Sequence, residues 1–140
     1  MSNRLYFFLR AVVCSGLILA SAVAQNAKAP DTVPNEPFQA VHLISIPPSG
    51  EKAVMADLAD VNAAIAKAGC PSCVYHLWKV TGTQTGVYNY IRISSWPGRD
   101  VYVKVHDSAD YKAAVGKHPE VEPFYHAQVY NRYVEVPIGK

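Results

Sequence analysis

The chain has 140 residues, of which 50% are hydrophobic and 17% are charged, a composition typical of a globular domain rather than a disordered or fibrous chain. Its 13 Lys and Arg residues nearly balance its 11 Asp and Glu residues and form no basic cluster. This excludes a surface that follows the phosphates of a nucleic acid, and it argues equally against an anionic membrane as a partner.

The first 24 residues have the pattern of a secretory signal peptide. A short lead with Arg4 and Arg10 precedes the apolar run "AVVCSGLILASAVA" (11–24), which is too short to span a bilayer and ends in a small-x-small cleavage pattern. We therefore expect removal of residues 1–24, a secreted or periplasmic protein, and no membrane association after cleavage. A noncleaved anchor is the alternative.

Residues 25–37 contain three prolines without hydrophobic periodicity, and they are expected to form a linker. The remaining residues, 38–140, show no internal repeat and are expected to form a single domain. Its first predicted strand is the short apolar and β-branched run "VHLISI" (41–46).

The segment 49–69 predicts an amphipathic helix. Four apolar residues at steps of four, three and four would form one stripe along it: Val54, Leu58, Val61 and Ile65. Gly69 is suited to end the helix. Asp57 and Asp60 are expected on its solvated side.

Two cysteines follow this helix directly, in "GCPSCVYH" (69–76). Cys14 would leave with the signal peptide, so Cys70 and Cys73 would be the only cysteines in an oxidising compartment, where a disulfide is the default. Their place at a helix C-terminus disfavours a reactive thiolate. We therefore expect a structural disulfide; a redox pair, or a metal clip completed by His76, are the alternatives, although no second ligand pair for zinc is present.

Three further segments predict strands. The runs "VYHLWKV" (74–80) and "VYNYIRISSW" (87–96) flank a loop whose glycines favour a hairpin, and the alternating run "HAQVYNRYVEV" (126–136) predicts the last strand. The segment 99–106 is ambiguous, because its β-branched run "VYVKV" favours a strand whereas the four-residue spacing of its outer valines suits a helix. If residues 99–106 form a helix, the element order is βαββαβ. If they form a strand, the sheet gains an extra edge strand.

Several short motifs resemble the dimeric α/β-barrel superfamily: "VHL" in the first strand, Trp96 at the end of the third, and "HDSADY" (106–111) and "KHPEVEPFY" (117–125) before the last. This superfamily includes antibiotic-biosynthesis monooxygenases, haem-degrading monooxygenases and stress-responsive A/B-barrel cyclases. The resemblance covers about residues 38–136. It implies an α+β, ferredoxin-like βαββαβ fold with helices on one face of a four-stranded antiparallel sheet, and it favours a helix at 99–106.

The strand residues also favour a homodimer. The third strand carries large apolar or aromatic residues on both faces, with Ile91 and Ile93 on one and Tyr90 and Trp96 on the other. One layer of helices covers only one face of a sheet, so a second copy of the chain would cover the other, as in the dimeric barrel that the resemblance implies. A monomeric barrel with an extra strand is the alternative.

The resemblance places a small-ligand pocket between sheet and helices. Five residues are candidates for its catalytic groups: His42, Trp96, His106, Tyr111 and His118. In haem-degrading members a helix histidine ligates iron beside a strand-end tryptophan, which implies His106 as a cofactor ligand next to Trp96, although His42 replaces their first-strand asparagine. In the cyclases a first-strand histidine and a helix tyrosine perform acid–base work; His42 and Tyr111 match them, but Val121 stands where a further histidine would be.

Two functions remain open on these observations. One is an exported monooxygenase-like enzyme, cofactor-free or haem-linked, that acts on a small molecule in this pocket. The other is a noncatalytic module that binds a small aromatic or lipid-like ligand. Imidazoles can act as acid, base or ligand near neutral pH, but each candidate also has a structural explanation as a buried histidine, a core tryptophan or a helix cap.

Overall fold

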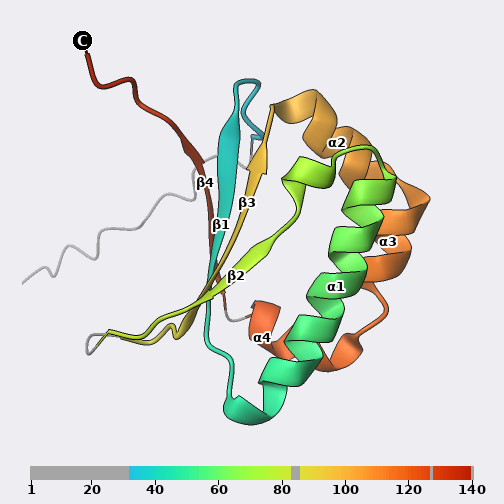
Figure 1. Cartoon of the computed structure of the whole chain (residues 1–140), viewed down its shortest axis with the longest axis vertical. Coiled ribbons are helices and arrows are strands. Elements are labelled where there is room, and N and C mark those ends of the chain that lie inside the picture. Colours follow the sequence, from blue (N-terminus) through green and yellow to red (C-terminus); the bar gives the residue numbers. More distant parts are fainter. Residues whose placement is uncertain (1–31, 83–85, 127, 140) are drawn as a thin grey trace, which may run out of the picture. The chain divides into compact units, whose positions relative to one another are not determined.

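The computed structural model describes residues 32–82, 86–126 and 128–139, which form a four-stranded sheet and a layer of helices (Figure 1). The expected signal peptide and the start of the linker lie outside the described residues. The strands and α-helices are β1 (Phe38–Ile44), α1 (Glu51–Lys67), β2 (His76–Lys79), β3 (Tyr90–Trp96), α2 (Arg99–Asp107), α3 (Ala109–Val115), α4 (Glu122–His126) and β4 (Val129–Val134). This is the βαββαβ order that the sequence predicts, with its second helical region divided into three.

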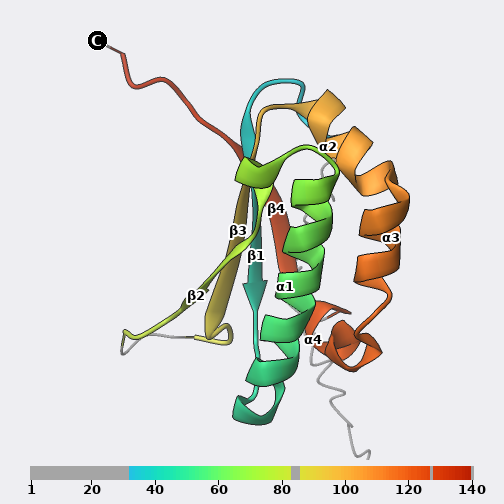
Figure 2. The same ribbon diagram turned by 45° about the vertical axis from the view of Figure 1, so that its right-hand side comes forward.

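The sheet has the strand order β2-β3-β1-β4, and every neighbouring pair is antiparallel. In the register of β1, His42 lies opposite Arg92 on β3 and opposite Tyr130 on β4. Because side chains alternate along a strand, these three residues point to the same face. The helices lie on one side of the sheet (Figures 1 and 2), and the burial of His42 and Arg92 identifies theirs as the covered face.

Helix α1 buries the apolar stripe that its periodicity predicts, and all four residues of the stripe are in the core. The helix ends at Lys67, and Gly69, two residues later, has a φ of 101°. The N–H of Gly69 donates to the carbonyl of Ala66 and that of Cys70 to the carbonyl of Ile65, a pattern that glycine favours at this position. Cys70 and Cys73 form the expected disulfide in the turn that leads to β2.

The ambiguous segment 99–106 is helical and lies within α2. Its burial explains the outcome, because Val105 is completely buried while Val103 is exposed, so the segment has one inner side rather than alternating sides. The N–H of Tyr111 donates to the Oγ of Ser108, which caps α3 as expected from its position. Within the described ranges, no helix is both long and apolar enough to cross a membrane.

Candidate functional site

Charged and polar side chains lie inside the layer between the sheet and the helices. Among the buried residues are His42 on β1, Arg92 on β3 and Asp57 on α1, which are 6%, 8% and 2% exposed. Burying an ionisable group costs free energy unless neighbouring groups compensate for it. We therefore treat their surroundings as the candidate site and name it the Arg92 site, defined by His42, Tyr75, Arg92, Tyr111 and Tyr125.

Arg92 is surrounded by tyrosines rather than by carboxylates. Its Cζ lies 4.0 Å from the ring centroid of Tyr75 and 4.9 Å from that of Tyr125, distances suited to cation–π contacts. In the described part of the chain Arg92 forms no ion pair, and its Nε has no hydrogen-bond partner. Burial acts to lower the pKa of Arg92, but the hydroxyls of Tyr75, Tyr125 and Tyr111 outweigh it and raise that pKa, so the guanidinium stays charged.

His42 is a neutral base with one open nitrogen. Its Nδ1–H donates to Oε1 of Gln128 at 2.7 Å, and its ring stacks on that of Tyr130 with the centroids 4.5 Å apart. This tautomer leaves Nε2 as an acceptor, and Nε2 has no hydrogen-bond partner among the described residues. Burial, helped by the charge of Arg92, lowers the pKa of His42 to about 3. The imidazole is therefore uncharged at neutral pH.

His106 lies beside this site in a stack of aromatic rings. Its Nδ1–H donates to the carbonyl oxygen of Tyr102 at 2.8 Å, and its ring centroid lies 3.7 Å from Tyr102, 4.3 Å from Tyr111 and 5.1 Å from Trp96. Burial lowers the pKa of His106 as well. Trp96 is only 2% exposed, and its Nε1–H donates to the Oγ of Ser94 at 2.7 Å.

These contacts do not fit a haem group beside His106. A macrocycle bound through this imidazole would need free space next to the ring, but three aromatic side chains occupy it. Binding of haem would require Trp96, Tyr102 or Tyr111 to move. The residues support acid–base or binding chemistry at the Arg92 site better than iron chemistry at His106.

Tyrosines connect the two groups of residues. The hydroxyl of Tyr111 on α3 interacts with that of Tyr75, and burial raises the pKa of Tyr111, so Tyr111 is a protonated hydrogen-bonding group at neutral pH. Asn62 holds Tyr75 in place, because its side chain accepts from the Tyr75 N–H at 2.7 Å and donates to the Tyr75 carbonyl at 2.9 Å. Tyr75 is thereby fixed against the Arg92 guanidinium.

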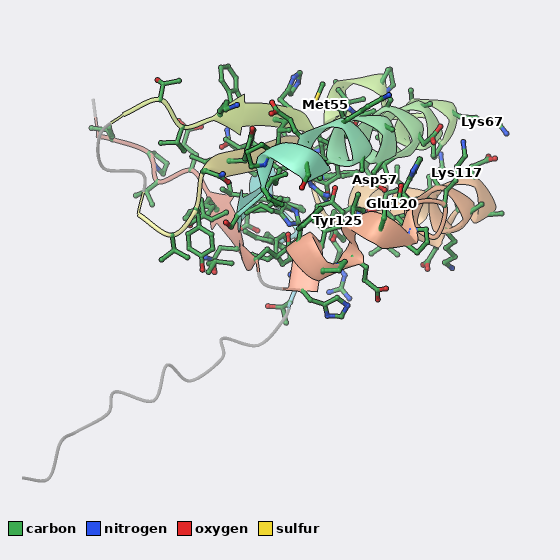
Figure 3. The ribbon with its side chains drawn as sticks, turned by 90° about the horizontal axis from the view of Figure 1, so that it is seen from below. Met55, Asp57, Lys67, Lys117, Glu120 and Tyr125 are labelled. Atoms are coloured by element: carbon green, nitrogen blue, oxygen red, sulfur yellow. A yellow bond between two sulfur atoms is a disulfide. The ribbon has the colours of Figure 1, made fainter. Side chains whose placement is uncertain are left out.

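The expectation that Asp57 lies on a solvated face is wrong. Asp57 is buried, and the hydroxyl of Tyr125 on α4 donates to its Oδ2 at 2.7 Å (Figure 3). Burial raises the pKa of this carboxyl. The reason is its spacing: Asp57 follows Val54 by three residues and precedes Val61 by four, so it shares their side of α1. The sequence contained this signal, but the polar residue type obscured it.

The structure brings four of the five candidates together and separates the fifth. His42, Trp96, His106 and Tyr111 belong to one continuous aromatic and polar cluster. His118 instead lies 2.8 Å from the Asp60 carboxylate through its Nε2, and this hydrogen bond raises its pKa. The sequence reasoning missed four residues of the cluster: Asp57, Tyr75, Arg92 and Tyr125.

Comparisons with known proteins bear on the fold. No family model matches the sequence, and no curated protein matches it. A candidate antibiotic biosynthesis monooxygenase from Caulobacter crescentus matches with a TM-score of 0.55 and 20% identity over 75% of this chain and 94% of that one. SnoaB, a cofactor-independent oxygenase from Streptomyces nogalater, matches with a TM-score of 0.53 and 10% identity over 74% and 96%.

A third match is a dimeric ferredoxin-like protein from Thermobifida fusca, with a TM-score of 0.51 and 16% identity over 71% of this chain and 91% of that one. The chain has the ferredoxin-like fold that these proteins share. At these identities the likeness concerns the fold alone. It nevertheless confirms the fold class, and the Arg92 site lies in the layer between sheet and helices where the resemblance implies a ligand pocket.

A hollow of about 450 Å³ lies outside the Arg92 site. Its lining includes Val115, Pro119, Val121 and Tyr125. Tyr125 therefore contacts the hollow as well as Arg92 and Asp57. Tyr125 is thus a residue that the hollow and the buried guanidinium share.

Proposed function

We propose that this chain is an exported, monooxygenase-like protein that acts on a small aromatic molecule at the Arg92 site. The observation that carries the proposal is His42, a buried neutral imidazole whose Nε2 has no partner in the described part of the chain. Such a nitrogen can accept the proton of an acidic hydroxyl on a bound phenol or enol. The known structures of similar fold include a cofactor-independent oxygenase, which supports this chemistry.

The proposed reaction uses dioxygen as the oxidant and the substrate as the source of electrons. Transfer of the hydroxyl proton to Nε2 of His42 leaves an electron-rich anion that can reduce dioxygen. The negative charge of this anion raises the pKa of the adjacent imidazole above its value of about 3 in the unliganded protein and is itself stabilised by the Arg92 guanidinium. One oxygen atom converts an activated CH₂ group of the substrate into C=O, and the other leaves as water. The buried position of His42 keeps bulk water from competing for the same proton.

Oxygen uptake by the purified protein tests this function. With a panel of phenols and activated polycyclic ketones, we expect dioxygen consumption that falls at least about 100-fold in His42→Phe, because general-base catalysis contributes about that much. Arg99→Gln is the control, since Arg99 is exposed and lines neither the Arg92 site nor the hollow beside Tyr125. Ligand binding without oxygen uptake would instead identify a noncatalytic binding module for a small aromatic or lipid-like molecule.

We further propose a homodimer formed through the uncovered face of the sheet. This open face carries seven large apolar or aromatic residues: Val41, Leu43, Trp78, Ile91, Ile93, Val129 and Tyr133. Trp78 is 61% exposed, and no described helix lies on this side of the sheet (Figure 2). Apolar residues in such number favour a protein partner over solvent.

Export rests on the composition of residues 1–24, which lie outside the described residues. The mass of the protein recovered from the periplasm or medium tests it, because cleavage after Ala24 would give a chain that begins at Gln25. Recovery of the full-length chain in the cell membrane would support the noncleaved anchor instead.

A further inference from the structure

The charge of the Arg92 site is not balanced by ion pairs. Asp57 is the nearby carboxylate, and the Tyr125 side chain both donates to it and contacts Arg92. A second guanidinium, that of Arg132, lies 5.3 Å from the ring centroid of Tyr102 and 4.9 Å from that of Tyr130. No ion pair of the described residues balances the Arg92 guanidinium, and His42 and His106 are neutral imidazoles.

The open hydrogen-bonding atoms form a matched pair. His42 and Arg92 are cross-strand neighbours on β1 and β3, and both side chains point to the covered face. Both residues are more than nine-tenths buried, and each has one nitrogen without a partner in the described residues. The Nε–H of Arg92 is a charged donor, and Nε2 of His42 is a neutral acceptor.

We infer that the Arg92 site takes an aromatic hydroxy acid. The carboxylate accepts a charge-assisted hydrogen bond from Arg92, and the neighbouring hydroxyl donates to His42. Tyr125, whose ring packs on the guanidinium, also lines the hollow of about 450 Å³ and can contact an aromatic ligand that enters from there. This inference rests on the proposed function and names its substrate class.

The way in passes Tyr125. Tyr125 lines the hollow of about 450 Å³, which is large enough for a single-ring ligand, and its ring also contacts Arg92. Helix α4 has only five residues, none of them fully buried, and it packs on the core through the partly buried side chains of Phe124 and Tyr125. Displacement of Tyr125 from Asp57 connects the hollow with Arg92 and gives an acid a path to the guanidinium.

Calorimetric titration with four probes tests the inference without turnover, in the absence of dioxygen. Salicylate has both groups, salicylamide lacks the charge, benzoate lacks the hydroxyl, and benzamide lacks both. We expect salicylate to bind about 10- to 100-fold more tightly than salicylamide, as charged hydrogen bonds require. Arg92→Gln abolishes this difference but keeps the preference for salicylate over benzoate. His42→Phe abolishes the preference for salicylate over benzoate but keeps the preference for salicylate over salicylamide.

The controls keep the outcomes separate. Arg99→Gln removes an exposed positive charge and leaves all four affinities unchanged. If Arg92→Gln does not fold, the comparison of salicylate with salicylamide on the unaltered protein still decides. Equal affinities, or binding of none of the four probes, overturns the inference. Salicylate binding without oxygen uptake for any substrate defeats the proposed reaction alone, and oxygen uptake with neutral phenols but no preference for acids defeats the hydroxy-acid inference alone.

Discussion

In the middle of the sheet, the two faces have compositions opposite to those expected of a sheet with one face in solvent. Such a sheet normally places apolar residues under the helices and polar residues toward solvent. Here the covered face holds the charged or polar side chains of His42, Arg92 and Ser94, whereas the open face holds apolar ones such as Val41 and Ile93. This contrast supports the proposed ligand site on the covered face and the proposed dimer interface on the open face.

This contrast explains why the proposed dimer and the proposed ligand site depend little on each other. The core that stabilises the fold comes mainly from α1 and from the ends of β1 and β3, where Ile44, Ile65 and Trp96 are fully enclosed. The middle of the covered face then carries polar groups at a cost in stability. Changes on the open face should alter assembly, and changes on the covered face should alter binding.

The largest expected effect comes from charging the open face. Ile93 lies at its centre, opposite Val41 on β1 and His76 on β2. In Ile93→Glu, an unpaired carboxylate would be buried in each half of a symmetric interface, and we expect the dimer to dissociate at least about 1,000-fold more readily. Light scattering after size exclusion measures the mass of both proteins.

Met55→Glu is the matched control for this change. Met55 is 55% exposed on α1, in the layer of helices (Figure 3), and it receives the same apolar-to-acidic substitution. It should leave the dimer intact. A monomeric unaltered protein in dilute buffer, or an Ile93→Glu variant that remains dimeric, would refute the interface on the open face.

The next effect concerns acid, and it belongs to the covered face. The pKa of His42 is about 3 in the folded protein against 6.5 as the ordinary value, so the unfolded chain binds more protons below pH 6.5. Stability is therefore complete above pH 6.5 and falls as the pH drops toward 3. The loss approaches about 1.4 kcal/mol per pH unit, or about 2 kcal/mol between pH 6.5 and 5.

Urea unfolding at these two pH values measures this loss, and His42→Phe should remove most of it. The variant is needed as a reference because other groups titrate too. The lowered pKa of His106 adds to the loss, whereas the raised pKa of Asp57 opposes it. If His42→Phe loses as much stability in acid as the unaltered protein, His42 is not held neutral by burial.

The sequence predicted the elements of the fold better than the contents of the site. Periodicity located α1, and the flanking cysteines located the turn that follows it, because both depend on neighbours along the chain. The start of β1 was placed three residues late, at 41 instead of Phe38, since two residues of its buried side precede the recognisable apolar run.

Arg92 shows why the site itself was incompletely predicted. In "YIRISSW" the arginine alternates with Ile91 and Ile93, so the local pattern places Arg92 toward solvent and the isoleucines toward the core. The helices in fact cover the face that carries Arg92. The connections of the whole sheet decide which of the two alternating sets of strand residues faces the helices, and no single strand contains that information. His42, Trp96, His106 and Tyr111 were found because the resemblance supplied their place in the fold.

The smallest expected effect distinguishes an asparagine that positions a side chain of the Arg92 site from one that only stabilises the fold. The side chain of Asn62 accepts a hydrogen bond from the N–H of Tyr75 and donates one to its carbonyl. The side chain of Asn89 makes the same pair of hydrogen bonds with the backbone of Ile46, each 2.8 Å long. Replacing either asparagine by alanine should cost about 1–3 kcal/mol, because it leaves buried backbone groups unpaired. Urea unfolding measures this cost, and the two variants should resemble each other.

Ligand affinity should then distinguish the two asparagines. Tyr75 lies against Arg92, whereas Ile46 belongs to the apolar core, so Asn62→Ala should weaken salicylate binding several-fold and Asn89→Ala should not. If both variants lose affinity equally, general loosening of the fold accounts for the loss, and the position of Tyr75 does not. If Asn62→Ala alone loses affinity, the hydrogen bonds from Asn62 on α1 to the backbone of Tyr75 set the position of the Arg92 guanidinium. Asn62 would then act through Tyr75, because no interaction found among the described residues joins Asn62 to Arg92 directly.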